Sequence, residues 1–208
     1  MSTSWIWYTA RAAGMVAWAL LAITVIFGLV RSTNIGRAGR SAGAARIAPP
    51  GGARARLRPV WVVDLHRFLA ALTAAFTAVH VVAILADTYV HFDIAQVLVP
   101  FSSSWHPVAV AWGTVALYLI VAIEVTSPAQ RHLPRGVWRR VHYATLPLFV
   151  SATVHGLAAG TDRSTMVVIL MAVVVSLAVT GLVAVRLRRA TRIGPPVRSH
   201  AYTSGRTG

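Results

Sequence analysis

Cysteine is absent from this chain of 208 residues. Its absence excludes disulfide bonds, thiolate metal sites, cysteine-held iron–sulfur clusters and covalent haem attachment through a C-x-x-C-H motif. Lysine is absent too, so all twenty basic residues are arginines. Any metal or cofactor must therefore be held mainly by histidine, and the chain has eight histidines.

Charge is also scarce. Only 12% of the residues are charged and 56% are hydrophobic, whereas about a quarter of the residues of a soluble domain are charged. The charges gather in blocks between long uncharged runs, which is typical of an integral membrane protein. The net charge of +15 does not indicate a nucleic-acid partner, because the arginines flank apolar spans and no soluble domain remains to read a groove.

Five apolar segments are long enough to cross a bilayer, which takes about 20 residues. They predict an all-α integral membrane bundle with spans at about 12–30, 68–86, 107–123, 141–159 and 166–185. The first segment lacks the basic n-region and the A-x-A site of a signal peptide, so we expect it to be a retained span. Residues 1–11 precede it as an outer segment, whose aromatic cluster WIWY suits the membrane interface.

The arginines are distributed unevenly between the connecting segments. They are concentrated in 31–60, 126–140 and 187–208, and they are missing from 87–106. The positive-inside rule then places the N-terminus outside and the C-terminus in the cytoplasm of a multi-pass cell-membrane protein. We therefore expect a transmembrane domain over 12–186, with 31–60 as a cytoplasmic linker and 187–208 as a basic cytoplasmic tail. The apolar run IAQVLVPF in segment 87–106 is too short to span and suits a short interfacial helix.

Four of the histidines lie within predicted spans: His66 and His80 in the second, and His142 and His155 in the fourth. Both spans run from inside to outside, so His66 and His142 are expected near the cytoplasmic face and the other two nearer the outer face. Spacings of fourteen and thirteen residues correspond to about 21 Å and about 20 Å along a helix. The sequence therefore predicts two levels, each with one histidine from each span.

Two neutral imidazoles on neighbouring helices suit a haem iron bound axially from both sides, with its apolar macrocycle in the bundle. Zinc or copper would require three or four ligands at one level, and each level offers two. We therefore predict two b-type haems, one held by His66 and His142 and the other by His80 and His155. The alternative is four unrelated buried histidines that are hydrogen-bonded to backbone or hydroxyl groups. Two pairs with nearly equal spacing, on two spans of the same direction, argue against this alternative.

The helical rotation fits only one of the two spans. At 100° per residue, His66 and His80 share a face, but His142 and His155 are about 140° apart on an ideal helix. Pro147 lies between the latter two and could distort the helix. The other four histidines lie in loops or the tail, where we expect solvated side chains: His91, His106, His132 and His200.

Arginines flank the predicted inner level. Arg67 follows His66, and Arg139 and Arg140 precede His142. Guanidinium groups pair well with carboxylates such as haem propionates, and the same arginines can equally be positive-inside anchors. At the outer level, Arg163 is the arginine expected nearby. We expect Glu124, at the cytoplasmic end of the third span, to pair with an arginine or to reach the interface.

The stretches LHRFLAALTAAFTAVH and WRRVHYATLPLFVSATVHGLAAG resemble the haem-carrying helices of the ferric reductase-like transmembrane domain family. This family includes NADPH oxidases, ferric-chelate reductases and the membrane subunit of the bacterial methionine sulfoxide reductase system. The resemblance covers roughly 5–186. It implies two b-type haems that bridge the second and fourth spans and pass electrons across the membrane, and NADPH oxidases share the unequal histidine spacing.

The chain departs from the full-length reductases of that family in one respect. Only about twenty residues follow the last span, and no G-x-G-x-x-G motif follows a predicted strand. We therefore expect an electron-transfer subunit of an oxidoreductase, served by a separate flavoprotein reductase, a quinol or a flavin from a partner, with an acceptor on the outer side. Two alternatives remain: a haem-bearing anchor of a larger redox complex, and a haem-free, histidine-lined metal or proton transporter.

Overall fold

The computed structural model describes residues 3–44, 60–88, 92–160 and 165–191, and in these residues the chain is helical, with no strand. The predicted all-α fold is therefore confirmed. The helices are α1 (Thr3–Ala44), α2 (Val60–Ala86), α3 (Ile94–Leu98), α4 (Pro107–Thr126), α5 (Arg135–Tyr143), α6 (Thr145–Ala159) and α7 (Met166–Thr191), with a short 3₁₀ turn, η2 (Pro128–Arg131), before α5.

Among the described residues, four helices are long and apolar enough to cross a membrane. They are Trp5–Ser32, Trp61–Ala86, Pro107–Thr126 and Met166–Arg189, which correspond to the first, second, third and fifth predicted spans. The chain thus has the helices of a multi-pass membrane protein. The predicted fourth span, 141–159, is divided between α5 and α6, and the 15 residues of α6 are fewer than the about 20 that a bilayer requires.

The break between α5 and α6 has a local cause. Proline lacks the N–H that would bond to the carbonyl four residues earlier, and its ring clashes with that carbonyl. For Pro147 the residue concerned is Tyr143, where α5 ends. Ala144 forms the junction: its N–H lies 2.9 Å from the Val141 carbonyl oxygen, a tight three-residue turn, and its own carbonyl accepts a regular bond from Leu148.

Three helix boundaries differ from those expected. Helix α1 continues to Ala44, so the beginning of the predicted linker 31–60 is helical. Helix α2 begins at Val60 rather than at 68, so His66 lies within a formed helix instead of before it. Helix α7 likewise extends into the predicted tail, as far as Thr191. Residues 45–59 and 192–208 lie outside the described part.

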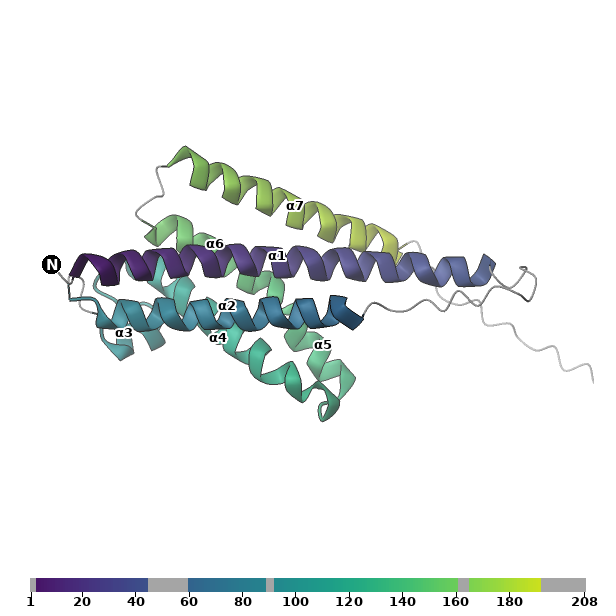
Figure 1. Cartoon of the computed structure of the whole chain (residues 1–208), viewed down its shortest axis with the longest axis horizontal. Coiled ribbons are helices and arrows are strands. Elements are labelled where there is room, and N and C mark those ends of the chain that lie inside the picture. Colours follow the sequence, from purple (N-terminus) through teal and green to yellow (C-terminus); the bar gives the residue numbers. More distant parts are fainter. Residues whose placement is uncertain (1–2, 45–59, 89–91, 161–164, 192–208) are drawn as a thin grey trace, which may run out of the picture.

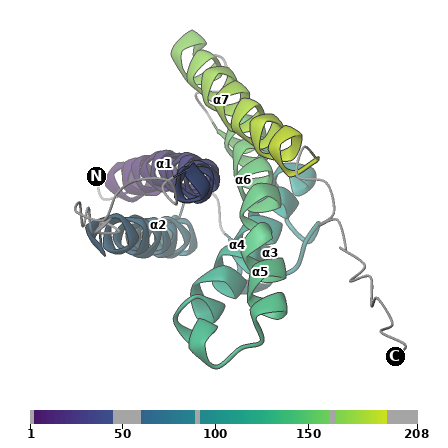
Figure 2. The same ribbon diagram turned by 90° about the vertical axis from the view of Figure 1, so that its right-hand side faces the viewer.

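The helices form two groups. Helices α1 and α2 run side by side, and α4, α5 and α6 form the second group, with α7 packed along α1 (Figures 1 and 2). The buried core joins α1, α4, α6 and α7 through Leu21, Ala22, Val25, Leu29, Ala116, Ile120, Ile123, Leu148, Phe149 and Val179. Helix α2 contributes no buried residue to this cluster. It packs mainly against α1, and its other side borders the space between the two groups.

The connection between α2 and α4 is held against the first half of α4. The Thr114 hydroxyl donates to the Val97 carbonyl oxygen at 2.9 Å, and the Tyr118 hydroxyl donates to the Leu98 carbonyl oxygen. Both acceptors belong to α3, so the expected short helix in segment 87–106 is present and is held by side chains of α4. His106, at the N-cap of α4 directly before Pro107, has a left-handed backbone conformation (φ 42°).

Candidate cofactor sites

The structure brings together the histidines that the sequence pairs. The ring centroids of His66 and His142 lie 6.2 Å apart, and those of His80 and His155 lie 6.3 Å apart. We call the first two the inner pair and the other two the outer pair, after the expected orientation. Each pair joins α2 to the α5–α6 segment. On one ideal helix His142 and His155 would point about 140° apart, yet both lie close to their partners on α2. The break at Ala144 accounts for this, because it places the two histidines on different helices.

The two separations match what one metal ion between two imidazoles requires. A first-row metal ion lies about 2 Å from an imidazole nitrogen, and that nitrogen lies roughly 1 Å from its own ring centroid. Two imidazoles on opposite sides of one ion therefore have centroids about 6 Å apart. Both pairs have this spacing, although neither pair is joined by a hydrogen bond between its two rings.

The outer pair is oriented by backbone carbonyls. His80 Nδ1 lies 2.6 Å from the Ala10 carbonyl oxygen of α1, and His155 Nδ1 lies 2.8 Å from the Ala109 carbonyl oxygen of α4. A carbonyl oxygen can only accept, so each Nδ1 carries the proton and donates. Nε2 is then the unprotonated nitrogen in both rings, which is the form that ligates a metal, and the carbonyl bond fixes the ring orientation.

The inner pair is held in another way. His66 stacks on Phe27 with centroids 6.4 Å apart, and His142 stacks on Trp138 with centroids 5.0 Å apart and ring planes at 16°. Both Nδ1 atoms are buried and have no hydrogen-bond partner within the described residues. The inner rings are therefore positioned by aromatic contact, and the outer rings by hydrogen bonds.

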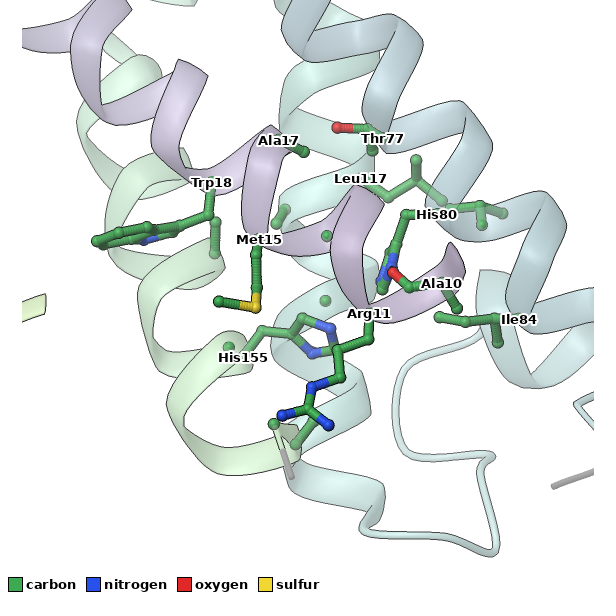
Figure 3. Close-up of a pocket in the computed structure, with 18 of the residues that line it drawn as sticks. Ala10, Arg11, Met15, Ala17, Trp18, Thr77, His80, Ile84, Leu117 and His155 are labelled. Atoms are coloured by element: carbon green, nitrogen blue, oxygen red, sulfur yellow. The ribbon is translucent and has the colours of Figure 1, made fainter. Parts of the chain in front are cut away.

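A cavity of about 560 Å³ lies between the outer histidines. This volume is within the range of about 300–1,000 Å³ that is usual for ligand pockets. Its lining comes from α1, α2, α4, α6 and α7 and is mainly apolar, and His80 and His155 enter it from opposite helix groups (Figure 3). The inner pair lines neither this cavity nor a second one of about 310 Å³ between α2 and α4.

The arginines nearest the histidines differ from those expected. Arg67, Arg139 and Arg140 are exposed, and no contact joins them to the inner pair within the described residues. The charges that act on the inner pair are those of Arg31 on His66 and Arg186 on His142. Helix geometry explains the position of Arg67, because a residue next to a histidine in the sequence points about 100° away from it on a helix.

Arg11 is the arginine of the outer cavity. It lines that cavity in Figure 3 and stacks over Trp7 with its guanidinium carbon 5.0 Å from the ring centroid. The sequence prediction named Arg163 for this level, which lies outside the described residues. Arg11 could have been found from the antiparallel pairing of the first two spans, because that pairing brings the start of α1 level with the end of α2.

Other predicted features have separate outcomes. His106 packs edge-on against Trp105 with centroids 4.5 Å apart and His132 is exposed, so neither joins the two pairs; His91 and His200 lie outside the described part.

Glu124 lines the smaller cavity. Within the described residues it has neither the arginine partner that we expected nor any hydrogen bond.

The donor set excludes some kinds of metal site in the described part of the chain. No group of three or more His, Cys, Asp or Glu side chains converges there. Tetrahedral zinc sites use three or four protein ligands, so neither pair fits one. At the outer pair, two opposed imidazoles beside an apolar cavity fit a haem, whose macrocycle would supply the remaining four ligands of the iron. The inner pair offers two imidazoles at the same spacing but lines neither of the two cavities.

Comparison with known proteins adds no relative: no family model, no curated protein and no solved structure matches the chain. The resemblance to the ferric reductase-like transmembrane domain family therefore stays a hypothesis based on the two quoted stretches, and the geometry of the histidine pairs has to carry the functional argument.

Proposed function

We propose that this protein is a two-haem b-type membrane cytochrome that moves electrons across the bilayer. One observation carries the proposal: two histidine pairs connect the same two helical segments at two levels, with ring centroids 6.2 Å and 6.3 Å apart. One such pair is a common result of packing. Two pairs at the same spacing, in a bundle with no three-ligand cluster among its described residues, favour two axially ligated haems.

The outer pair provides the stronger support. His80 and His155 each have Nδ1 committed to a carbonyl, which leaves Nε2 as the ligand atom, and the cavity beside them is lined mainly by apolar side chains. Arg11 offers a guanidinium to a propionate at this level. At the inner level His66 and His142 are the ligands, and Arg31 and Arg186 replace Arg67, Arg139 and Arg140 as the arginines near the haem carboxylates.

A bound haem supplies a one-electron redox centre, and two histidine ligands leave no axial position for a substrate. The residues of the chain set the conditions for that chemistry. Apolar side chains of α1, α4 and α6 line most of the outer cavity, and the stacked rings of Phe27 and Trp138 hold the inner histidines. An outer acceptor would therefore take electrons at the edge of the bundle.

The proposal includes the arrangement in the membrane. The chain crosses the cell membrane five times, with α5 and α6 together forming the fourth crossing, its N-terminus outside and its C-terminus in the cytoplasm. The support is the alternation of arginine-rich and arginine-poor connections along the sequence. As the electron donor we propose a separate flavoprotein reductase, a quinol or a flavin supplied by a partner.

Haem content tests the proposal directly. The protein, purified in detergent after expression with haem supplied, should give a b-type reduced-minus-oxidised spectrum and about two haems per chain by the pyridine haemochrome method. His106→Ala and His132→Ala serve as matched controls, because these histidines lie outside both pairs, and both variants should retain two haems. A wild-type protein without haem would overturn the proposal and favour the transporter alternative.

A further inference from the structure

Glycines lie against the outer histidines. A Cβ atom added to Gly14 would lie 2.9 Å from His80 Nδ1, and one added to Gly113 would lie 2.7 Å from Nδ1 of His155. Real Cβ atoms almost never come this close to another heavy atom. Each imidazole therefore occupies the volume that any other residue at the glycine position would need.

Each glycine also has a fixed relation to the carbonyl that orients the same histidine. Ala10 precedes Gly14 by four residues, and Ala109 precedes Gly113 by four. In an α-helix, the carbonyl oxygen of residue i already accepts the N–H of residue i+4. A ring that reaches the second lone pair of that oxygen must lie flat on the helix surface over residue i+4, where a side chain would otherwise stand.

The same device therefore occurs twice, on α1 for His80 and on α4 for His155, and residues 10–17 and 109–116 share the pattern A-x-A-x-G-x-V-A around the two glycines. The inner pair lacks it. A Cβ atom at Gly28 would lie 3.5 Å from Cε1 of His66, an ordinary contact, and Nδ1 of His66 has no hydrogen-bond partner among the described residues. Gly136, Gly156 and Gly181 have nothing within 4 Å of such an atom.

We propose that Gly14 and Gly113 are positioning residues of the outer site. Each lets one imidazole lie against its helix, so that Nδ1 donates to the carbonyl four residues earlier and Nε2 is left as the ligand. The outer site is thus preorganised by backbone atoms of α1 and α4, neither of which supplies a ligand. The inference rests on the proposed function for the identity of the ligand group, but the orientation of the rings follows from the protein alone.

Single alanine substitutions test this inference. Gly14→Ala and Gly113→Ala should each lower haem content from about two to about one per chain. Where the outer haem is retained, they should shift its electron paramagnetic resonance g-values and its midpoint potential. The inner signal should stay unchanged. Alanine has a higher helix propensity than glycine, so a loss of haem would not come from a weakened helix.

Gly28→Ala and Gly181→Ala are the matched controls. The first puts a methyl group at ordinary contact distance from an inner histidine, and the second adds one to open space on α7, at a position that lines neither cavity. Both should keep two haems with unaltered spectra. Retention of two unaltered haems in both Gly14→Ala and Gly113→Ala would overturn the inference, as would equal loss of both haems. A wild-type chain without haem would instead overturn the proposed function.

Discussion

The imidazole rings of His80 and His155 face each other at 6.3 Å between centroids, and each is tied through Nδ1 to a carbonyl of a different helix. Removal of either ring should abolish the outer site and leave the inner one. We expect His80→Ala and His155→Ala to retain about one haem per chain, measured by pyridine haemochrome. Full haem content in either variant would show that the ligand assignment is wrong.

The break before α6 is predicted to be necessary for the inner pair. Pro147→Ala restores an N–H that can bond to the Tyr143 carbonyl and join α5 to α6 in one helix. Because α6 is anchored in the core through Leu148 and Phe149, α5 should rotate and carry His142 away from His66. The inner haem should then be lost or altered while the outer one remains.

The control for this change is Pro134→Ala. Pro134 lies at the N-cap of α5, outside the regular helix, and its replacement should leave both haems in place. The reduced-minus-oxidised spectra of the two variants, compared with those of His66→Ala and His80→Ala, identify which haem has changed. An unaltered inner signal in Pro147→Ala would mean that the ring positions do not depend on the break.

Arg11 is predicted to set the potential of the outer haem. Its positive charge at the cavity favours the reduced form, which has one positive charge fewer than the oxidised form. Arg11→Gln should therefore lower the midpoint potential of the outer haem in a redox titration, and Arg135→Gln, at an exposed position of α5, should not. Equal potentials in wild type and Arg11→Gln would exclude this role.

A hydrogen bond from Trp18 Nε1 to the Thr153 hydroxyl, at 2.9 Å, joins α1 to α6. Trp18→Phe removes the donor and should lower the free energy of unfolding by about 1 kcal/mol, apart from the effect of the smaller ring. A double-mutant cycle with Thr153→Val isolates the bond, measured by denaturation of the detergent-solubilised protein. A coupling energy near zero would mean that the contact contributes nothing to stability.

Membrane topology can be tested without removing native thiols, because the chain has no cysteine. In the proposed arrangement, Ser104→Cys should react with an impermeant maleimide added outside intact cells, whereas Gln130→Cys and Thr191→Cys should react only after permeabilisation. All three positions are exposed. If α5 and α6 do not cross the membrane, Thr191→Cys would be labelled from outside like Ser104→Cys.

The sequence was sufficient to predict the class of fold and the pairing of the histidines. Apolar length marks a membrane helix wherever it occurs, and four of the five predicted spans reappear as long helices. The pairing of His66 with His142 and of His80 with His155 follows from direction and spacing along two spans, both of which are one-dimensional properties. The break between α5 and α6 allows His142 and His155, thirteen residues apart, both to reach α2. Pro147 indicated such a break in the sequence, but the sequence did not place it at Ala144.

The tertiary structure alone decided how the rings are held. Arg67 is adjacent to His66 in the sequence but exposed, while Arg31 from another helix acts on that ring. The carbonyl oxygens of Ala10 and Ala109, and the space left by Gly14 and Gly113, could not be assigned a role from the sequence, because every residue has a carbonyl and a short shared pattern around two glycines does not say what packs against it. They gain a role only when the packing of α1 on α2, and of α4 on α6, lays an imidazole against them.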